Sequence, residues 1–345
     1  MTEARCRIFL FTYRRSHLLG RALAGLQSQT MPDWVCEVHN DDPRDPEPRR
    51  IVEAMGDDRI QLVDHPRNLG AMAAYNLAFS SVPEEYSAMA QDDNWWADDF
   101  LETMIGVLDR HPECKVAVSN QWHVHEQKDG SWLDTGKTTR PVRDGVYRVT
   151  WPHIFSVVSA WYADGSTVMR SDGLEALKVP EAAPFAMVEA LRERLFAFPL
   201  LFVARPLMYF AVTLDSARAE GGGDYSACQA LLAGAFFRHV SLDPESFEAW
   251  LDAQCRGSVP PWNLLILTGL ADPACRWLWS HVPARGWVRF TAGAARRPRM
   301  IMETLRRMLT DQELRRFLDE ATLRQVQALP APPRTFSQEE ALCSE

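Results

Sequence analysis

Four short polar clusters in the N-terminal part of the chain carry side chains that could do chemistry. The clusters are Thr12-Tyr13-Arg14, Asn40-Asp41-Asp42, Asn68-Leu69-Gly70 and Asp92-Asp93-Asn94. Each falls at the end of a predicted strand or in the turn that follows it. In a parallel sheet the carboxyl ends of the strands share one edge, and ligands of such folds bind there. We therefore expect the four clusters to meet in one site.

The residue types in these clusters suit a nucleotide diphosphate. Two acidic pairs could hold Mg²⁺ or Mn²⁺, which prefer oxygen ligands and can neutralise a diphosphate. Gly70, at the start of a predicted helix, would let backbone N–H groups approach an anion. The ring of Tyr13 could stack on a base. Each cluster alone has a simpler interpretation as a solvated turn or a helix cap, so the signal lies in their order and spacing.

Two common phosphate-binding loops are missing from the sequence. Neither G-x-G-x-x-G nor G-x-x-x-x-G-K-[ST] occurs, which argues against a Rossmann dinucleotide site and against a P-loop. The predicted site would therefore bind its diphosphate without a glycine-rich loop.

Short apolar runs that alternate with helical patterns must position these clusters. Strands are predicted at 6–12, 34–39, 60–63, 86–90 and 115–119, and helices at 18–28, 49–55, 71–79 and 98–109. This alternation predicts an α/β fold with a mostly parallel sheet covered by helices. Beyond an irregular stretch at 120–180, we expect a helix at 182–196, strands at 200–203 and 207–212, and a mainly helical region at 225–328.

Composition narrows the class of protein. The chain has 345 residues and a formal net charge of −9, which argues against a general nucleic-acid binder. No apolar run reaches the roughly 18 residues that span a bilayer, and the N-terminus lacks the form of a signal peptide. The seven cysteines are scattered without a C-x-x-C pair, as expected in a reducing cytoplasm.

The run FTYRRSHLLGRALAGLQSQTMPDW resembles the opening of family 2 glycosyltransferases of the GT-A fold. The resemblance continues through Asn40-Asp41, NLGAMAAYN at 68–76 and AQDDNWWADDFLE at 90–102, and it covers residues 5–120 well and 120–213 loosely. It implies a doubly wound, mostly parallel sheet of the GT-A type with a helical C-terminal region. The implied divisions are a catalytic domain at 1–215, a helical region at 216–329 and a disordered tail at 330–345, with Gly221-Gly222-Gly223 as a hinge or mobile loop.

The resemblance also implies roles for individual residues. It places Thr12, Tyr13 and either Asn40 or Asp41 at the base and ribose, and Asp92 at the diphosphate. Asp93 would be the ligand of Mn²⁺ or Mg²⁺. The remaining residues implied at the nucleotide-sugar site are Arg14, Asn68, Gly70 and Asn76.

A carboxylate on the opposite face of the sugar would take the proton of the acceptor hydroxyl. Glu189 fits the family pattern best, with Glu181 and Asp172 as alternatives, and Glu189 could also be an ordinary solvated helix residue. Trp95 and Trp96 are candidates for a wall of the acceptor site, although at least one is expected to pack in the core.

The sequence departs from the family pattern at four places. Gln91 stands where many relatives have Asp, Asn40 where Asp is usual, and Tyr75 where many have Arg. A histidine that some relatives supply as a further metal ligand has no match near Val212-Thr213. The departure at Gln91 weakens the prediction of a metal without excluding it.

The expected function is transfer of a sugar, with inversion, from a nucleotide-diphosphate sugar to an acceptor hydroxyl. The expected donor is a UDP sugar, and the expected acceptor is a polysaccharide or surface glycan. A catalytically silent nucleotide-sugar-binding or scaffold protein of the same fold is the alternative. A sugar-phosphate nucleotidyltransferase would need a glycine-rich loop after the first strand, and Thr12-Tyr13-Arg14-Arg15-Ser16 has no glycine.

The C-terminal region contains an arginine-rich stretch. Residues 285–316 hold nine arginines and three acidic residues. A basic amphipathic helix near 296–316 could lie on an anionic membrane surface, for example on the inner face of a membrane. The simpler interpretation is a helix that packs its apolar face on its own domain.

Overall fold

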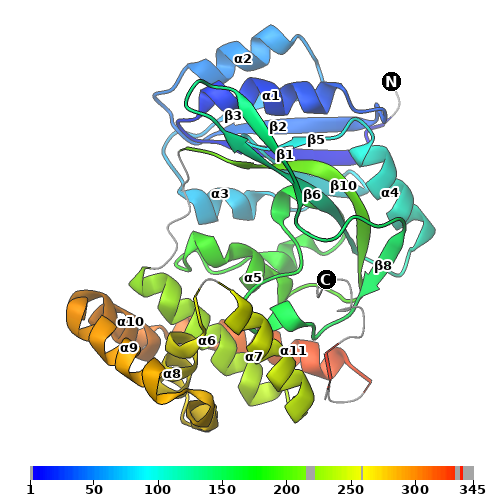
Figure 1. Ribbon diagram of the computed structural model, residues 1–345. Helices are drawn as coiled ribbons and strands as arrows, with labels where there is room; N and C mark the ends of the chain where they lie inside the picture. Colours follow the sequence, from blue (N-terminus) through cyan, green and yellow to red (C-terminus); the bar gives the residue numbers. More distant parts are fainter. Residues whose placement is uncertain (1–2, 215–221, 258, 331–334, 337–345) are drawn as a thin grey trace.

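A large mixed sheet forms the centre of the N-terminal part of the computed structural model, which describes residues 3–214, 222–257, 259–330 and 335–336 (Figure 1). Within that described part, the ten-stranded sheet has the order β3-β2-β1-β4-β9-β6-β10-β5, with β7 beside β6 and β8 beside β10. The strands are β1 (Cys6–Thr12), β2 (Trp34–Asn40), β3 (Ile60–Asp64), β4 (Tyr86–Gln91), β5 (Trp95–Trp96), β6 (Val116–Glu126), β7 (Trp132–Thr138), β8 (Val146–Val149), β9 (Thr167–Arg170) and β10 (Leu200–Val212).

The four strands that carry the predicted site run parallel. β1 pairs in parallel with β2 and β4, and β2 with β3. The other half of the sheet is mixed, because β9 runs antiparallel between β4 and β6 while β6 and β10 are parallel. The α/β class is therefore as the sequence predicts, with the purely parallel part confined to β3-β2-β1-β4.

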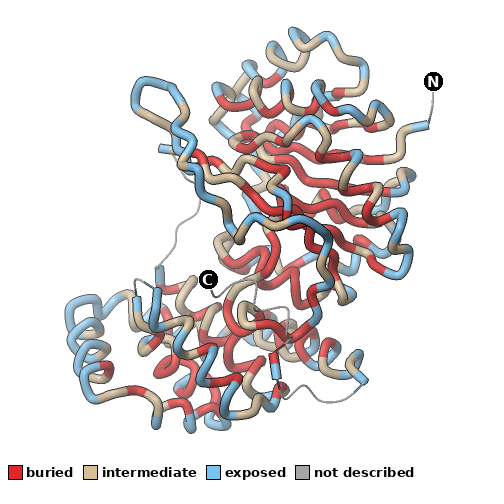
Figure 2. Tube along the Cα trace, turned by 45° about the vertical axis from the view of Figure 1, so that its right-hand side comes forward, coloured by how far each residue is buried: buried red, intermediate tan, exposed pale blue. Residues whose placement is uncertain are grey.

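Side chains of β1 alternate between two cores, as the period of a strand requires. Ile8 and Leu10 pack with α1 (Ser16–Gln27) and α4 (Phe100–Arg110) on one face. Phe9 and Phe11 pack with α3 (Ala71–Leu77) on the other. The sheet is thus covered on both faces, and α2 (Glu47–Met55) lies beside α1. Figure 2 shows the buried residues concentrated along the strands.

Beyond residue 180, two predicted elements differ from those in the structure. The strands predicted at 200–203 and 207–212 are one strand, β10, with register shifts on both sides of Pro206. Proline has no N–H to donate to the ladder, so it sits at an irregularity and does not end the strand. The helix predicted at 182–196 is shorter, because residues 185–187 form a 3₁₀ turn and α5 covers only Val188–Glu193.

The C-terminal region is helical, as predicted, and it packs against the half of the chain that contains the sheet. Its helices are α6 (Gly223–His239), α7 (Pro244–Arg256), α8 (Trp262–Ala271), α9 (Ala284–Arg296), α10 (Pro298–Thr310) and α11 (Gln312–Ala328). Apolar residues of α6, α8, α10 and α11 share one core with Met72 of α3 and with α5. Gln325 of α11 donates to the backbone oxygens of Arg194 and Phe196 at 2.9 and 2.7 Å.

Some expectations fall largely outside the described residues. Gly221 lies outside them, whereas Gly223 begins α6. Most of the tail predicted at 330–345 also lies outside, although Phe336 is described and is buried against Phe236. The domain divisions remain predictions. No helix in the described part of the chain combines the length and apolarity needed to cross a membrane.

Candidate active site

A cavity of about 660 Å³ opens at the carboxyl ends of β1 and β2. Its size falls in the range of small-molecule sites, about 300–1,000 Å³. It is lined by Phe11, Thr12, Tyr13, Arg14, Arg15, Asp41, Asn68, Gly70, Ala71, Ala74, Tyr75, Phe185 and Leu214. Three of the four predicted clusters therefore contribute to one cavity. They meet because Thr12 pairs with Asn40 in the parallel register of β1 and β2.

Asp41 links its own cluster to the Asn68-Leu69-Gly70 cluster by hydrogen bonds. Its carboxylate accepts hydrogen bonds from the Asn68 side chain at 2.8 Å and from the backbone N–H groups of Leu69 and Gly70 at 2.7 and 3.2 Å. Gly70 has a φ of +85°, a conformation that glycine adopts without strain, and it precedes α3. The carboxylate thereby fixes where α3 begins, and α3 forms one wall of the cavity.

The turn after β1 presents Tyr13 and Arg14 to the cavity. Arg14 has a φ of +58°, which is uncommon for a residue other than glycine. Its guanidinium donates to Asp42 at 2.8 Å and lies 4.8 Å from the Tyr13 ring centroid. The Tyr13 side chain is 40% exposed, so its ring is available for stacking on a flat ligand.

Asn40 and Asn76 hold the surroundings together and do not line the cavity. The Asn40 amide donates to the backbone oxygen of Asp45 and to the Asp64 side chain, both at 3.0 Å. Asn76 on α3 exchanges two hydrogen bonds with the backbone of Val179, at 2.8 and 3.2 Å. These bonds fix the loop that carries Phe185 over α3.

The acidic pair at the end of β4 is held by an arginine. Arg15 donates from Nη2 to Asp92 Oδ1 at 2.5 Å and from Nη1 to Asp93 Oδ2 at 2.8 Å. The Asp92 side chain is 1% exposed and that of Asp93 is 18% exposed. Burial raises the pKa of Asp92, and the neighbouring Arg15 charge opposes that rise. Arg15 also lines the cavity, so the fourth cluster reaches it through this side chain.

The residues in this arrangement do not fit a divalent cation. Mg²⁺ and Mn²⁺ need carboxylate oxygens that face an open position, and here the Arg15 guanidinium lies between the two carboxylates. Among the residues that the structure describes, no three carboxylate, histidine or cysteine side chains are grouped so that they could hold a metal ion. The family resemblance predicts a metal at Asp93, whereas the geometry places a guanidinium there.

Two residues that depart from the family pattern contact each other. Gln91 donates to the Tyr75 hydroxyl at 2.9 Å and accepts a hydrogen bond from Asn94. Asn94 in turn accepts from the backbone N–H of Ala211 at 2.7 Å and so joins the acidic pair to β10. Gln91 and Tyr75 thus form a neutral pair beside the cavity.

The two tryptophans after the acidic pair have different environments. Trp96 is 4% exposed, donates to the Gly165 backbone oxygen at 2.7 Å and packs in the core. Trp95 is partly exposed, and its ring stacks on that of Tyr209 with 5.0 Å between the ring centroids. Trp95 is the one of the two that could contact an acceptor.

The candidate bases lie in three different places. Glu189 is on α5, is 9% exposed, and is not among the residues that line the cavity, although Phe185 just before α5 is. Glu181 is exposed on the loop before Phe185. Asp172 follows β9, whose last residue, Arg170, pairs with Tyr86 at the start of β4.

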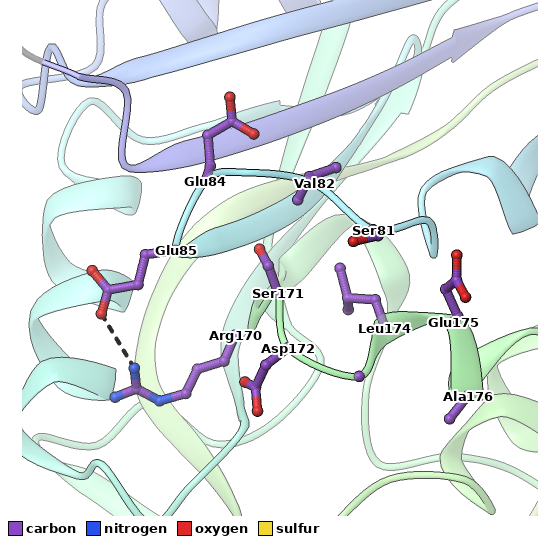
Figure 3. Close-up of a pocket in the computed structure, with 11 residues that line it drawn as sticks. Ser81, Val82, Glu84, Glu85, Arg170, Ser171, Asp172, Leu174, Glu175 and Ala176 are labelled. Atoms are coloured by element: carbon purple, nitrogen blue, oxygen red, sulfur yellow. Dashed lines mark hydrogen bonds and ion pairs between the residues drawn. The ribbon is translucent and has the colours of Figure 1, made fainter.

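That register puts Asp172 at the edge of the sheet opposite the acidic pair. Asp172 lines a separate open cavity there, beside Ser171, Glu175 and an ion pair between Arg170 and Glu85 (Figure 3). Its side chain pairs with Lys115. We therefore set Asp172 aside as a base, because it faces the wrong end of β4.

Sequence reasoning missed three residues at the site. Arg15, Tyr75 and Phe185 line the cavity, and none was assigned to the nucleotide or the diphosphate. For Arg15 a signal existed, because two arginines follow the first strand directly and face two predicted acidic clusters. Phe185 had no such signal, because only the packing of its loop on α3 brings it to the cavity.

Comparison with known proteins agrees with this geometry. Residues 8–158 match the family model described as glycosyl transferase family 2, and this range contains all four clusters. Residues 8–158 are therefore a glycosyl transferase family 2 domain. A curated relative is the Escherichia coli protein WfgD, a UDP-Glc:alpha-D-GlcNAc-diphosphoundecaprenol beta-1,3-glucosyltransferase, which is 26% identical over 101 residues. The match covers 29% of this chain and 40% of the length of that relative.

Two solved structures of S. aureus TarS share the fold of this chain. S. aureus TarS matches with a TM-score of 0.54 and 14% identity over 92% of this chain and 55% of TarS. TarS in complex with UDP-GlcNAc matches with a TM-score of 0.52 and 14% identity, over 92% of this chain and 91% of that one. The structural similarity covers 92% of this chain and therefore extends beyond the sheet into the helical region.

Proposed function

We propose that this family 2 glycosyltransferase moves a sugar, with inversion, from a UDP sugar to an acceptor hydroxyl on a glycan. The observation that carries the proposal is the single cavity in which Thr12, Tyr13 and Asp41 lie beside Arg15 and, through it, the acidic pair. The TarS complex with UDP-GlcNAc and the UDP-glucose donor named for WfgD support the choice of a UDP sugar. WfgD, whose acceptor carries a sugar, supports a glycan acceptor.

In this proposal, different residues around the cavity bind different parts of the UDP sugar. The exposed Tyr13 ring stacks on the base, and Thr12 and Asp41 lie at the nucleoside end. Arg14 and Arg15 face the diphosphate as cations. The resemblance predicts Mn²⁺ or Mg²⁺ at Asp93, but we route no step through a metal because Arg15 holds both carboxylates.

The proposed reaction is one displacement. The acceptor oxygen attacks the anomeric carbon and forms the new glycosidic bond as the bond from that carbon to the phosphate oxygen breaks. The bonding pair leaves with UDP, and the acceptor proton passes to a carboxylate. Attack on the face opposite the leaving group inverts the anomeric configuration.

Binding and turnover measured together test this proposal. UDP should bind the purified protein more tightly than GDP or CDP, and at least one UDP sugar should be hydrolysed slowly or transferred to a glycan acceptor. Binding of UDP with no turnover on any UDP sugar or acceptor would favour the silent nucleotide-sugar-binding alternative. Preference for another nucleotide would contradict the proposed donor.

We propose Glu189 as the catalytic base. The support is the family pattern and its position on α5, which directly follows the turn that brings Phe185 to the cavity. Glu189→Gln should lower turnover by about 10²–10⁴-fold, the contribution of a general base, and leave UDP affinity unchanged. Glu181→Gln is the matched control, and the reverse result would assign the base to Glu181.

We also propose that the arginine-rich helices contact an anionic membrane surface by charge. The apolar face of α10 is occupied, since Met308 is 1% exposed and Ile301 and Leu305 pack in the core. The outer face carries exposed arginines together with Met302 and Leu309.

Vesicle co-sedimentation tests this contact. The protein should bind phosphatidylglycerol vesicles, bind phosphatidylcholine vesicles weakly, and detach as salt rises because salt screens the charges. Changing Arg296, Arg297 and Arg299 together to Gln should weaken binding by roughly a hundredfold, at about 1 kcal/mol for each arginine. Equal binding to both kinds of vesicle would contradict a contact made by charge.

A further inference from the structure

We propose that the guanidinium of Arg15 takes the place of a divalent cation at Asp92 and Asp93 and supplies positive charge there, so that donor binding in this protein needs no metal. The inference rests on the proposed function, because it names the group that neutralises the donor diphosphate.

The first support is the geometry of the acidic pair. One guanidinium donates to an oxygen of each carboxylate, at 2.5 Å to Asp92 and 2.8 Å to Asp93. Arginine holds this position because it immediately precedes α1, and because β1 and β4 are adjacent, with Phe11 beside Gln91. Charge-assisted hydrogen bonds of this length are strong, so a cation that bound both carboxylates would first have to displace Arg15.

The second support is that Arg15 has donors left for a phosphate. A guanidinium has five N–H donors, and the two bonds to Asp92 and Asp93 use two of them. The same side chain lines the cavity and is 22% exposed. The planar donor set of arginine suits phosphate oxygens. Arg15 can therefore remain on the acidic pair while its other donors face the diphosphate.

The third support is the neutral pair of Gln91 and Tyr75. The amide of Gln91 carries no charge. The Gln91 side-chain amide donates a hydrogen bond to the Tyr75 hydroxyl and accepts one from Asn94. Position 91 therefore supplies no third carboxylate for a metal.

A second arginine adds positive charge at the acidic pair. Arg21 donates to the backbone oxygen of Asp93 at 2.7 Å, and its guanidinium lies 4.0 Å from the Trp95 ring centroid and 3.6 Å from that of Trp132. Its Nε and Nη1 atoms are buried and have no hydrogen-bond partner in the described part of the chain. Arg21 therefore places a second guanidinium next to Asp93, on its backbone.

Manganese binding without nucleotide tests the assignment directly. Free Mn²⁺ is measured by electron paramagnetic resonance as it is titrated into the wild type, Arg15→Gln and the control Arg44→Gln, which removes an exposed arginine. The wild type and the control should leave Mn²⁺ free at concentrations where Arg15→Gln takes up about one ion, with an affinity at least roughly tenfold higher. Equal uptake by the wild type and Arg15→Gln would overturn the assignment.

Calorimetric titration with UDP, in buffer with EDTA and in buffer with Mn²⁺, tests whether donor binding needs a metal. The wild type should bind UDP about equally in both. Arg15→Gln should lose roughly tenfold to a hundredfold in EDTA, the effect of losing charged hydrogen bonds, and regain affinity in Mn²⁺. A wild type that needs Mn²⁺ to bind UDP would overturn the inference.

Two further results separate this inference from the proposed function. A wild type that excludes Mn²⁺ but binds no UDP in either buffer would contradict the proposed donor, while the Mn²⁺ comparison would still support the assignment of Arg15. If Arg15→Gln does not fold, Arg15→Lys replaces it in the UDP titration. It keeps the charge but not the two-carboxylate bridge, and it should also lose UDP affinity in EDTA.

Discussion

Asp164→Ala is expected to lower the free energy of unfolding by about 3–5 kcal/mol, the usual cost of removing one partner of a buried ion pair. Asp164 and Arg192 both have side chains that are 0% exposed. Arg192 Nη1 donates to both oxygens of Asp164, at 2.9 and 3.0 Å. Without Asp164, the Arg192 charge would stay buried and unbalanced beside the Phe79 ring. Urea denaturation followed by circular dichroism measures the loss.

Two comparison variants isolate the cause of that loss. Asp172→Ala removes an exposed partner of Lys115, where the side chains are 69% and 41% exposed, and it should cost less than about 1 kcal/mol. Changing Asp164 to Leu and Arg192 to Met together removes both charges and should recover most of the stability. A loss below about 1 kcal/mol for Asp164→Ala alone would show that the pair does not act as a buried ion pair.

Asp41→Ala is expected to abolish measurable UDP binding and to lower the free energy of unfolding by about 2–4 kcal/mol. The carboxylate accepts from the Asn68 side chain and from the backbone of Leu69 and Gly70, and hydrogen bonds to charged groups contribute about 1.5–3 kcal/mol each. Loss of these bonds would release the start of α3, which is a wall of the cavity. Calorimetric titration with UDP and urea denaturation measure the two effects.

Asp42→Ala is the control for this prediction, because Asp42 lies in the same turn but does not contact α3. Its partners are Arg14, Arg44 and the backbone N–H of Arg44, and both arginine side chains are exposed. We expect a much smaller change in UDP affinity and in stability than for Asp41→Ala. Equal losses for the two variants would mean that Asp41 acts through the turn as a whole and not through α3.

The arrangement of Arg15 changes how the acidic pair is understood. The sequence resemblance predicts that Asp93 binds a metal and that Asp92 lies at the diphosphate. In the folded chain they hold an arginine, and that arginine lines the donor cavity. Residues for which the family resemblance predicts a metal would here position a cation that belongs to the protein.

Local pattern in the sequence was sufficient for the first half of the fold. The apolar spacing of α1 and α4 and the alternation along β1 follow from periodicities of 3.6 and 2 residues, which are properties of neighbouring residues. The strand ends predicted from the same runs, at residues 12, 39 and 90, lie within one residue of the observed ends at Thr12, Asn40 and Gln91. Because parallel strands align their ends, the sequence also placed Thr12, Tyr13, Asp41 and Gly70 at one edge, and the family motifs named the class of enzyme.

Only the tertiary structure decided which of those residues face the ligand. Asn40 and Asn76 turn to backbone and side-chain partners, Arg15 bridges Asp92 and Asp93, and Phe185 reaches the cavity from more than a hundred positions further along the chain. These outcomes depend on contacts between segments that are distant in sequence, and each polar side chain takes the partner that the packed fold brings within hydrogen-bond distance. A strand pattern determines the edge where a side chain lies, whereas the direction of its polar atoms is set by neighbours that only the folded chain supplies.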